Sequence, residues 1–252
     1  MTANGMMAFG LRLGQGRLVE YGLSLVSPLI EQVERYGHLP SIDSETSPIS
    51  QRRAWLTQGF AHLVKTARCM LTAVDLGLDF TRDAASAVVS QGLAGQQPDG
   101  RIVTRPEDEA TMLHLHLYAV EGLCVYGMAT GNDDALACAR RALEWAHKQR
   151  FSNGGIPQFV ITSDGTLGPE QCDVTAQFLR VAKLTGFESD LSPTTKCLYS
   201  LAFPVCGLGW AMPYQPGAAV VHRNVWASMF AASACEVSGW DHPQSLNWRH
   251  LV

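Results

Sequence analysis

In the stretch QPDGRI, residues 97–102, a glycine turn is followed closely by an apolar residue. Two later stretches repeat this arrangement, SNGGIP at 152–157 and GLGWAMP at 207–213. A weaker copy, RYGHLPS, precedes them at 35–41. This repetition predicts that the chain is built from several similar structural units, each with one such turn.

The glycines of these turns recur at nearly equal separations. Gly100, Gly155 and Gly209 are 55 and 54 residues apart, and Gly37 lies 63 residues before Gly100. A period of this size indicates paired helices packed side by side. Asp99 and its counterparts are therefore expected to form turns, with any chemistry beginning at the helix that follows each turn.

Each segment between the turns contains two stretches with apolar residues at helical spacing. The sequence predicts one helix before each turn, at 17–36, 81–96, 133–150 and 191–203. It predicts another after each turn, at 53–76, 109–130, 172–185 and 222–237. Gly77, Gly131, Gly186 and Gly239 are typical of helix ends.

The two sets of helices differ in character. Helices before the turns carry exposed-type charges such as Arg140 and Glu144, whereas HLYAVEGLCVYGMA and NVWASMFAASACE are apolar on most faces. An outer layer of exposed helices around an inner layer of buried ones predicts an all-α fold, an α/α toroid of about four helical hairpins. We expect a single domain over 1–252, with a flexible segment at 1–16.

Composition excludes several classes of function. Hydrophobic residues make up 46% and charged residues 17% of the chain, with a net charge of −4, which argues against disorder and against nucleic-acid binding through a basic face. The seven cysteines form no CxxC pair and are expected to be buried and reduced. No signal peptide or membrane span is predicted, so the cytoplasm is the expected location.

The quoted motifs resemble a known superfamily. Helices such as CDVTAQFLRVAKLTG and HLHLYAVEGLCVYGMATG, with loops like GGIP, are similar to the α/α toroids of six-hairpin glycosidases, N-acylglucosamine 2-epimerases, polysaccharide lyases and terpenoid cyclases. Their style is nearest to toroid proteins of bacterial polysaccharide biosynthesis. The resemblance implies a sugar or oligosaccharide substrate. Only four hairpins are visible instead of six, so the arc could be open or completed by a second copy in a homo-oligomer.

Each inner helix carries a polar stripe, because residues at i, i+4 and i+7 share a helical face. These stripes could line a cleft or pair with one another inside a packed core. The candidate catalytic residues are Asp173, Glu121, His114 and His222. The candidate substrate-binding residues are Tyr118, Gln177, Arg180, Trp226, Trp210, Tyr214 and His62.

The two carboxylates each have a functional and a structural interpretation. Asp173 lies where a helix begins, so the positive end of the helix dipole would stabilise its charge, and helix capping is the alternative. Glu121 lies within an apolar helix, where burial could raise its pKa for acid/base catalysis. A buried Glu121 that bonds to a loop is the alternative.

The histidines predict proton transfer more strongly than metal binding. His114 shares a face with Glu121, whereas His116 points about 200° away and is expected to be a core residue. The toroid prenyltransferases hold zinc with Asp, Cys and His, which Cys172, Asp173 and His222 could imitate only weakly. No metal and no cofactor is therefore predicted.

Other side chains suit a sugar without being specific for one. Trp210 and Tyr214 could stack on sugar rings at the mouth of a cleft or fill gaps between helix ends. Arg180 could bind a carboxylate or form a salt bridge.

Three functions remain open from the sequence. The leading hypothesis is a carbohydrate-active hydrolase, lyase or epimerase that uses acid/base residues. The second is a cyclase or prenyltransferase. The sequence contains no DDxxD motif, which counts against this hypothesis. The third is a non-catalytic helical scaffold, which closed salt bridges among the inner polar residues would favour.

Overall fold

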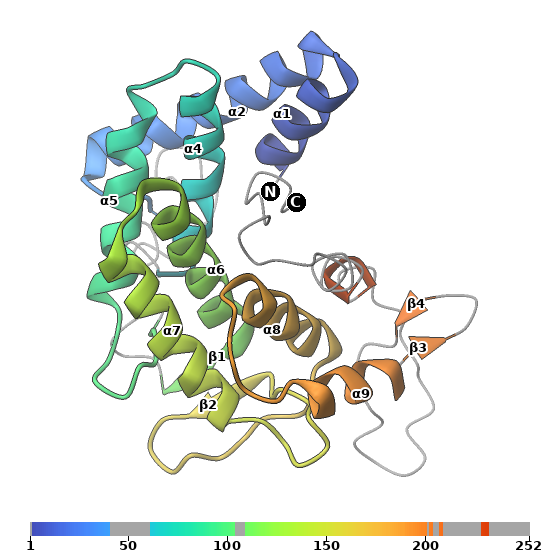
Figure 1. Cartoon of the computed structure of the whole chain (residues 1–252). Helices are drawn as coiled ribbons and strands as arrows, with labels where there is room; N and C mark the ends of the chain where they lie inside the picture. Colours follow the sequence, from blue (N-terminus) through green and yellow to red (C-terminus); the bar gives the residue numbers. More distant parts are fainter. Residues whose placement is uncertain are drawn as a thin grey trace, which may run out of the picture. The chain divides into compact units, whose positions relative to one another are not determined.

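The computed structural model describes residues 2–40, 61–103, 109–200, 202–203, 207–208 and 228–231 (Figure 1). Within these ranges the chain is mostly helical, as predicted. The helices of the outer type are α2 (Gly16–Tyr36), α5 (Thr81–Ala94), α7 (Asp133–Lys148) and α9 (Ser192–Ser200). Those of the inner type are α4 (Ala67–Asp75), which follows the 3₁₀ helix η2 (Ala61–Thr66), α6 (Leu113–Thr130) and α8 (Cys172–Leu184).

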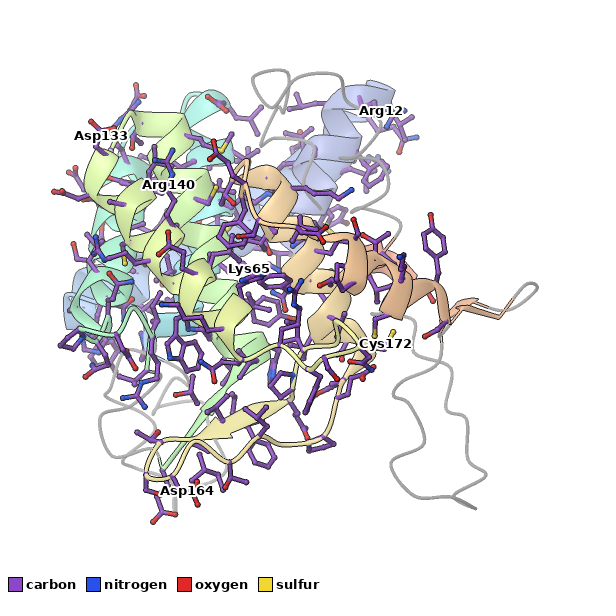
Figure 2. The ribbon with its side chains drawn as sticks, turned by 60° about the horizontal axis from the view of Figure 1, so that its bottom comes forward. Arg12, Lys65, Asp133, Arg140, Asp164 and Cys172 are labelled. Atoms are coloured by element: carbon purple, nitrogen blue, oxygen red, sulfur yellow. The ribbon has the colours of Figure 1, made fainter. Side chains whose placement is uncertain are left out.

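Burial separates the two types of helix. In α8 only Asp173 and Lys183 are more than marginally exposed, whereas α7 exposes charged side chains that include Asp133 and Arg140, both labelled in Figure 2. The predicted alternation of exposed and buried helices is therefore confirmed in the described part of the chain. Most of the predicted fourth inner helix, 222–237, lies outside the described residues.

Several boundaries differ from the prediction. Residues 2–13, for which the sequence suggested a flexible segment, form helix α1 (Thr2–Leu13). The helix expected from 109 is preceded by strand β1 (Ala110–Met112), which pairs antiparallel with β2 (Phe159–Ile161). Helix α9 ends at Ser200, and the next strands, β3 (Ala202–Phe203) and β4 (Gly207–Leu208), pair with each other.

The chain divides into two compact units. In the described part, the first unit contains residues 2–40, 61–95 and 121–137, and the second contains 96–103, 109–120, 138–200 and the short segments beyond. The division falls within α6, after Val120, and within α7, after Ala137. A single domain over the whole chain stays a prediction.

The first unit is held by side-chain bonds to the backbone as well as by apolar packing. The Thr81 hydroxyl donates to the Met70 carbonyl at 2.8 Å, joining the start of α5 to α4. The Gln91 amide both accepts from the backbone N–H of Leu39 and donates to its carbonyl, at 3.3 and 3.2 Å. These bonds fix the loop that follows α2 against α5.

The second unit contains two of the repeated turns, and they share one hydrogen-bond pattern. Gly100 N–H donates to the Gln97 carbonyl and Gly154 N–H to the Phe151 carbonyl, each at 2.9 Å. Both glycines have a φ of 97°, in the left-handed region that favours glycine. The structural repeat therefore pairs Gly100 with Gly154, one residue earlier than the sequence comparison placed it.

Each turn packs against the next outer helix. A Cβ on Gly100 would lie 2.5 Å from the Arg141 carbonyl oxygen in α7, and one on Gly154 would lie 2.3 Å from the carbonyl oxygen of Pro193 in α9. The apolar residue after each turn, Ile102 or Ile156, is fully buried. These contacts fix the loops that lead into α6 and α8.

Candidate functional site

Helix α8 begins at Cys172, labelled in Figure 2, and carries Asp173 in its first turn. The Asp173 carboxylate accepts a hydrogen bond from the Val174 N–H at 3.1 Å. Burial raises the pKa of Asp173, while backbone hydrogen bonds and the nearby His114 oppose this shift. The residue is half-buried, which leaves its carboxyl group able to meet a ligand.

His114 lies at the start of α6, and its ring meets that of Tyr118 edge to face at a centroid distance of 6.0 Å. Burial lowers the pKa of His114, and the Asp173 charge opposes this effect. At neutral pH the imidazole is thus uncharged and able to accept a proton. His114 at the start of α6 and Asp173 at the start of α8 therefore lie near enough for each charge to act on the other; their joint catalytic role stays a prediction.

Gln177 follows Asp173 by one helical turn and is fully buried. Among the described residues, neither its Nε2 nor its Oε1 has a hydrogen-bond partner, and the same is true of Nδ1 of His114. An unsatisfied buried polar group costs on the order of 1 to 3 kcal/mol. A ligand that both accepts and donates hydrogen bonds would remove this cost.

Arg180 and Tyr118 complete the polar face of the site. Arg180 is fully buried, and its guanidinium lies 5.0 Å from the centre of the Phe230 ring, a cation–π distance. Tyr118 packs against the apolar cluster that α8 forms with Phe230 and α9. We define the α6/α8 site as His114, Tyr118, Asp173, Gln177 and Arg180.

Glu121 belongs to the first unit and has a different environment. Its carboxylate lies 3.1 Å from Lys65 Nζ and 3.6 Å from Arg68 Nη1. The next residue, Gly122, lets α6 approach η2, because a Cβ there would lie 2.5 Å from the Val64 carbonyl oxygen. These contacts form a buried ion-pair cluster, which supports a structural role, and the catalytic role of Glu121 stays a prediction.

Several predicted residues cannot be placed. His222, Trp226, Trp210 and Tyr214 lie outside the described residues, and of His62 only the backbone, in η2, is described. No group of three His, Cys, Asp or Glu within the described ranges gathers in a way that could hold a metal ion. The weak zinc alternative includes His222 and stays a prediction.

Sequence reasoning missed Glu170, a buried carboxylate just before α8. Its Oε2 accepts a hydrogen bond from Asn153 at 2.6 Å, and its Oε1 accepts one from the Cys197 thiol at 3.2 Å. Burial and the Glu170 charge raise the pKa of Cys197, so this thiol stays protonated and can donate. Glu170 thus ties the turn at Asn153 and helix α9 to the start of α8, and no sequence motif indicated this role.

The helical arrangement is similar to those of solved carbohydrate-active enzymes. An unsaturated glucuronyl hydrolase from Bacillus sp. GL1 matches with a TM-score of 0.67 and 11% identity, over 92% of this chain and 70% of that one. A D-mannose isomerase matches with a TM-score of 0.67 and 10% identity, over 94% and 68%. A polysaccharide lyase matches with a TM-score of 0.55 and 10% identity, over 71% and 61%.

These likenesses establish the class of fold. The chain has an α/α-toroid fold, as its repeats and helices predicted. No protein-family model matches the chain, and no curated protein sequence matches it significantly. None of the helices in the described ranges is both long and apolar enough to cross a bilayer.

Proposed function

We propose that this protein is a carbohydrate-active enzyme and that the α6/α8 site transfers a proton at a carbon of an open-chain sugar or a sugar acid. The proposal rests on the electrostatic interaction of His114 with Asp173, together with the buried Gln177 amide one helical turn along α8 from Asp173. The Asp173 charge favours the protonated form of His114, while Nδ1 of that ring has no partner among the described residues. A neutral imidazole next to a carboxylate is suited to act as a general base.

The proposed step transfers a proton between His114 and a carbon of the substrate. His114 accepts the proton from the carbon next to the substrate carbonyl, and the electron pair of the C–H bond forms an enediolate. Asp173 stabilises the imidazolium that results, and Nε2 of Gln177 donates a hydrogen bond to the developing oxyanion. If the hydroxyl proton of the enediolate moves to the former carbonyl oxygen and His114 returns its proton to the neighbouring carbon, the product is an isomer. If a β-oxygen substituent is eliminated instead, it leaves with the proton that His114 holds, and the product is that of a lyase.

The other residues support binding of a polar substrate. Oε1 of Gln177 can accept a hydrogen bond from a hydroxyl group next to the reacting carbonyl. Arg180 supplies a fixed positive charge on the same face of α8, three residues further along. The fold likeness to a glucuronyl hydrolase, a mannose isomerase and a lyase supports the substrate class alone.

Solvent deuterium incorporation tests this proposal directly. The purified chain is incubated in D₂O with a panel of aldoses, ketoses and uronic acids, and exchange at carbon is followed by proton NMR. We expect exchange with at least one sugar, reduced at least about 100-fold in His114→Gln and unchanged in the control His38→Gln. Absence of exchange across the panel, or full exchange by His114→Gln, contradicts the proposal.

Glycoside hydrolysis is the second candidate, and the raised pKa of Asp173 favours it. A carboxyl group that keeps its proton longer than usual is suited to protonate the leaving oxygen. Hydrolysis would need a second carboxylate about 5 to 10 Å away. Release of reducing sugar from oligosaccharides without deuterium exchange at carbon would favour this candidate.

A further inference from the structure

Helices α1 and α2 form an antiparallel hairpin in the first unit, drawn in blue in Figure 1. Gly10 and Gly22 bring the helices close, since a Cβ on Gly22 would lie 2.5 Å from Met7 Cγ and one on Gly10 would lie 2.7 Å from Val19 Cγ2. The face of α2 that carries Val19 and Gly22 is thus covered by α1.

The opposite side of α2 is exposed along its length. Its residues are spaced by four, three, four and three positions, which keeps them on one line of the helix. They are Arg17, Tyr21, Ser24, Pro28 and Glu31, all exposed. We call this line the α2 stripe.

Large exposed apolar side chains lie in the α2 stripe and beside it. Tyr21 is 64% exposed and Leu25 45% exposed, and Phe9 and Leu13 of α1 are 45% and 59% exposed. In an antiparallel hairpin the helical spacing places Phe9 and Leu13 on the same flank as Tyr21 and Leu25. Several large exposed apolar side chains on one flank of a hairpin are typical of an interaction site.

We propose that the α2 stripe is the interface at which two copies of this chain form a symmetric dimer. The charge pattern of α2 favours a second copy as the occupant. When two α2 helices pair antiparallel about a two-fold axis at Ser24, residue 17 of one copy lies opposite residue 31 of the other. Arg17 then faces Glu31 of the second copy, and the symmetry repeats this pair at the other end.

The centre of the proposed interface suits a close crossing of helices. Ser24 is small, and its hydroxyl already donates to the Tyr21 carbonyl at 2.8 Å, so contact with another helix leaves no donor unsatisfied. Tyr21 lies opposite Ser27 and Pro28 of the second copy, where its ring can cover the proline. Apolar contact at the centre with paired charges at both ends is self-complementary.

Analytical ultracentrifugation of the full chain between about 1 and 100 μM tests the proposal. We expect a dimer, which Tyr21→Glu converts to a monomer, whereas Tyr199→Glu, an equally exposed tyrosine on α9, remains a dimer. A native chain that stays monomeric over this range, or a Tyr21→Glu variant with unchanged association, overturns the proposal. Monomers that bind vesicles of anionic phospholipid through this stripe would overturn it in favour of a membrane surface.

Exchanging the charges at positions 17 and 31 tests the proposed pairing of Arg17 with Glu31 of the second copy, even if Tyr21→Glu fails to fold. Arg17→Glu alone and Glu31→Arg alone each place like charges opposite one another twice, so each is expected to weaken the dimer by about tenfold or more. A mixture of the two variants restores both opposite pairs and should form a heterodimer with near-native affinity. If each variant binds a second copy of itself as tightly as it binds the other variant, then residues 17 and 31 do not lie opposite one another.

Discussion

The main-chain N–H of Ile102 donates a hydrogen bond to Nδ1 of His116 across 3.1 Å. Nε2 of the same ring lies 2.9 Å from the Ala142 carbonyl of α7, to which it donates. One neutral imidazole therefore joins the residue after the first turn to an outer helix. In the next repeat the Ile156 N–H donates instead to the Thr175 hydroxyl at 2.9 Å, so a different side chain of the inner helix fills the same role.

His116 makes stability depend on pH. Burial lowers the pKa of His116 to about 4 from its usual 6.5, so below pH 6.5 the unfolded chain binds a proton that the folded chain does not. Stability is complete above pH 6.5 and is lost as the pH falls toward 4, by about 2 kcal/mol at pH 5 from this group alone. Urea unfolding at pH 7.5 and 5 measures the effect. His116→Gln cannot titrate and should show a smaller difference between the two pH values; an equal difference would contradict this assignment.

Gly100 is expected to tolerate no side chain. Gly100→Ala combines an unfavourable positive φ with a 2.5 Å approach to the Arg141 carbonyl, and should lower the free energy of unfolding by roughly 2 to 4 kcal/mol. Gly165→Ala is the matched control, because Gly165 also has a positive φ of 72° but nothing lies within 4 Å of its Cβ position. The control should lose only about 1 kcal/mol. If chemical denaturation shows the same loss of unfolding free energy for both variants, the close approach of Gly100 to the Arg141 carbonyl does not contribute.

The pairing of His114 with Asp173 can be measured without a substrate. In Asp173→Asn the carboxylate that favours the imidazolium is absent, so the pKa of His114 should fall further below 6.5. Proton NMR titration of the His114 ring measures this shift. The control is Asp164→Asn, which changes an exposed carboxylate at the tip of the loop after β2 (Figure 2). This variant should leave the pKa of His114 unchanged. A His114 pKa that does not move in Asp173→Asn would mean that the two charges do not interact.

The buried Gln177 amide is expected to destabilise the folded protein while contributing to turnover. Gln177→Met replaces an amide without partners in the described part by an apolar side chain of similar length, and should raise the free energy of unfolding by about 1 to 3 kcal/mol while reducing turnover. The same change at Gln91 is the control, because that amide bonds to both backbone groups of Leu39 and its loss should be destabilising. Thermal unfolding of both variants, with the exchange assay, separates the two effects. A destabilised Gln177→Met would show that the amide is satisfied in the folded protein.

Glu121 should contribute mainly to stability. Glu121→Gln leaves Lys65 and Arg68 without the carboxylate between them, and loss of one partner from a buried ion pair costs about 3 to 5 kcal/mol. Glu144→Gln, on the exposed face of α7, should change stability by less than about 0.5 kcal/mol. Urea unfolding compares the two variants. A fully stable but inactive Glu121→Gln would instead support the catalytic role that the sequence suggested.

The fold could be predicted because its signals are local and repeated. The turn at Gly100 recurs at Gly154, and helices α6 and α8 were recognisable because most of their residues are apolar or small apart from one polar stripe. The three-residue strands β1 and β2 were missed because so short a segment shows no clear alternation. Helix α1 was missed because Gly5 and Gly10 lower its helix propensity, which its packing on α2 overrides.

The candidate site could be predicted only in part. Helical spacing placed Asp173, Gln177 and Arg180 on one stripe, and His114 on the helix that meets it. The partners of Glu121 could not be predicted, because they depend on how closely Gly122 lets α6 approach η2. Glu170 was missed for a similar reason, since its bonds to Asn153 and Cys197 join segments 17 and 27 residues away.

The packing of each turn against the next outer helix bears on how the protein is made. Gly100 rests on Arg141 and Gly154 on Pro193, which follow them by 41 and 39 residues. During synthesis on the ribosome, the turn of one hairpin therefore lacks its packing surface until the following outer helix has left the exit tunnel. Translation would complete the hairpins one after another from the N-terminus, and a chain that stops within α7 or before α9 would leave its last turn without support.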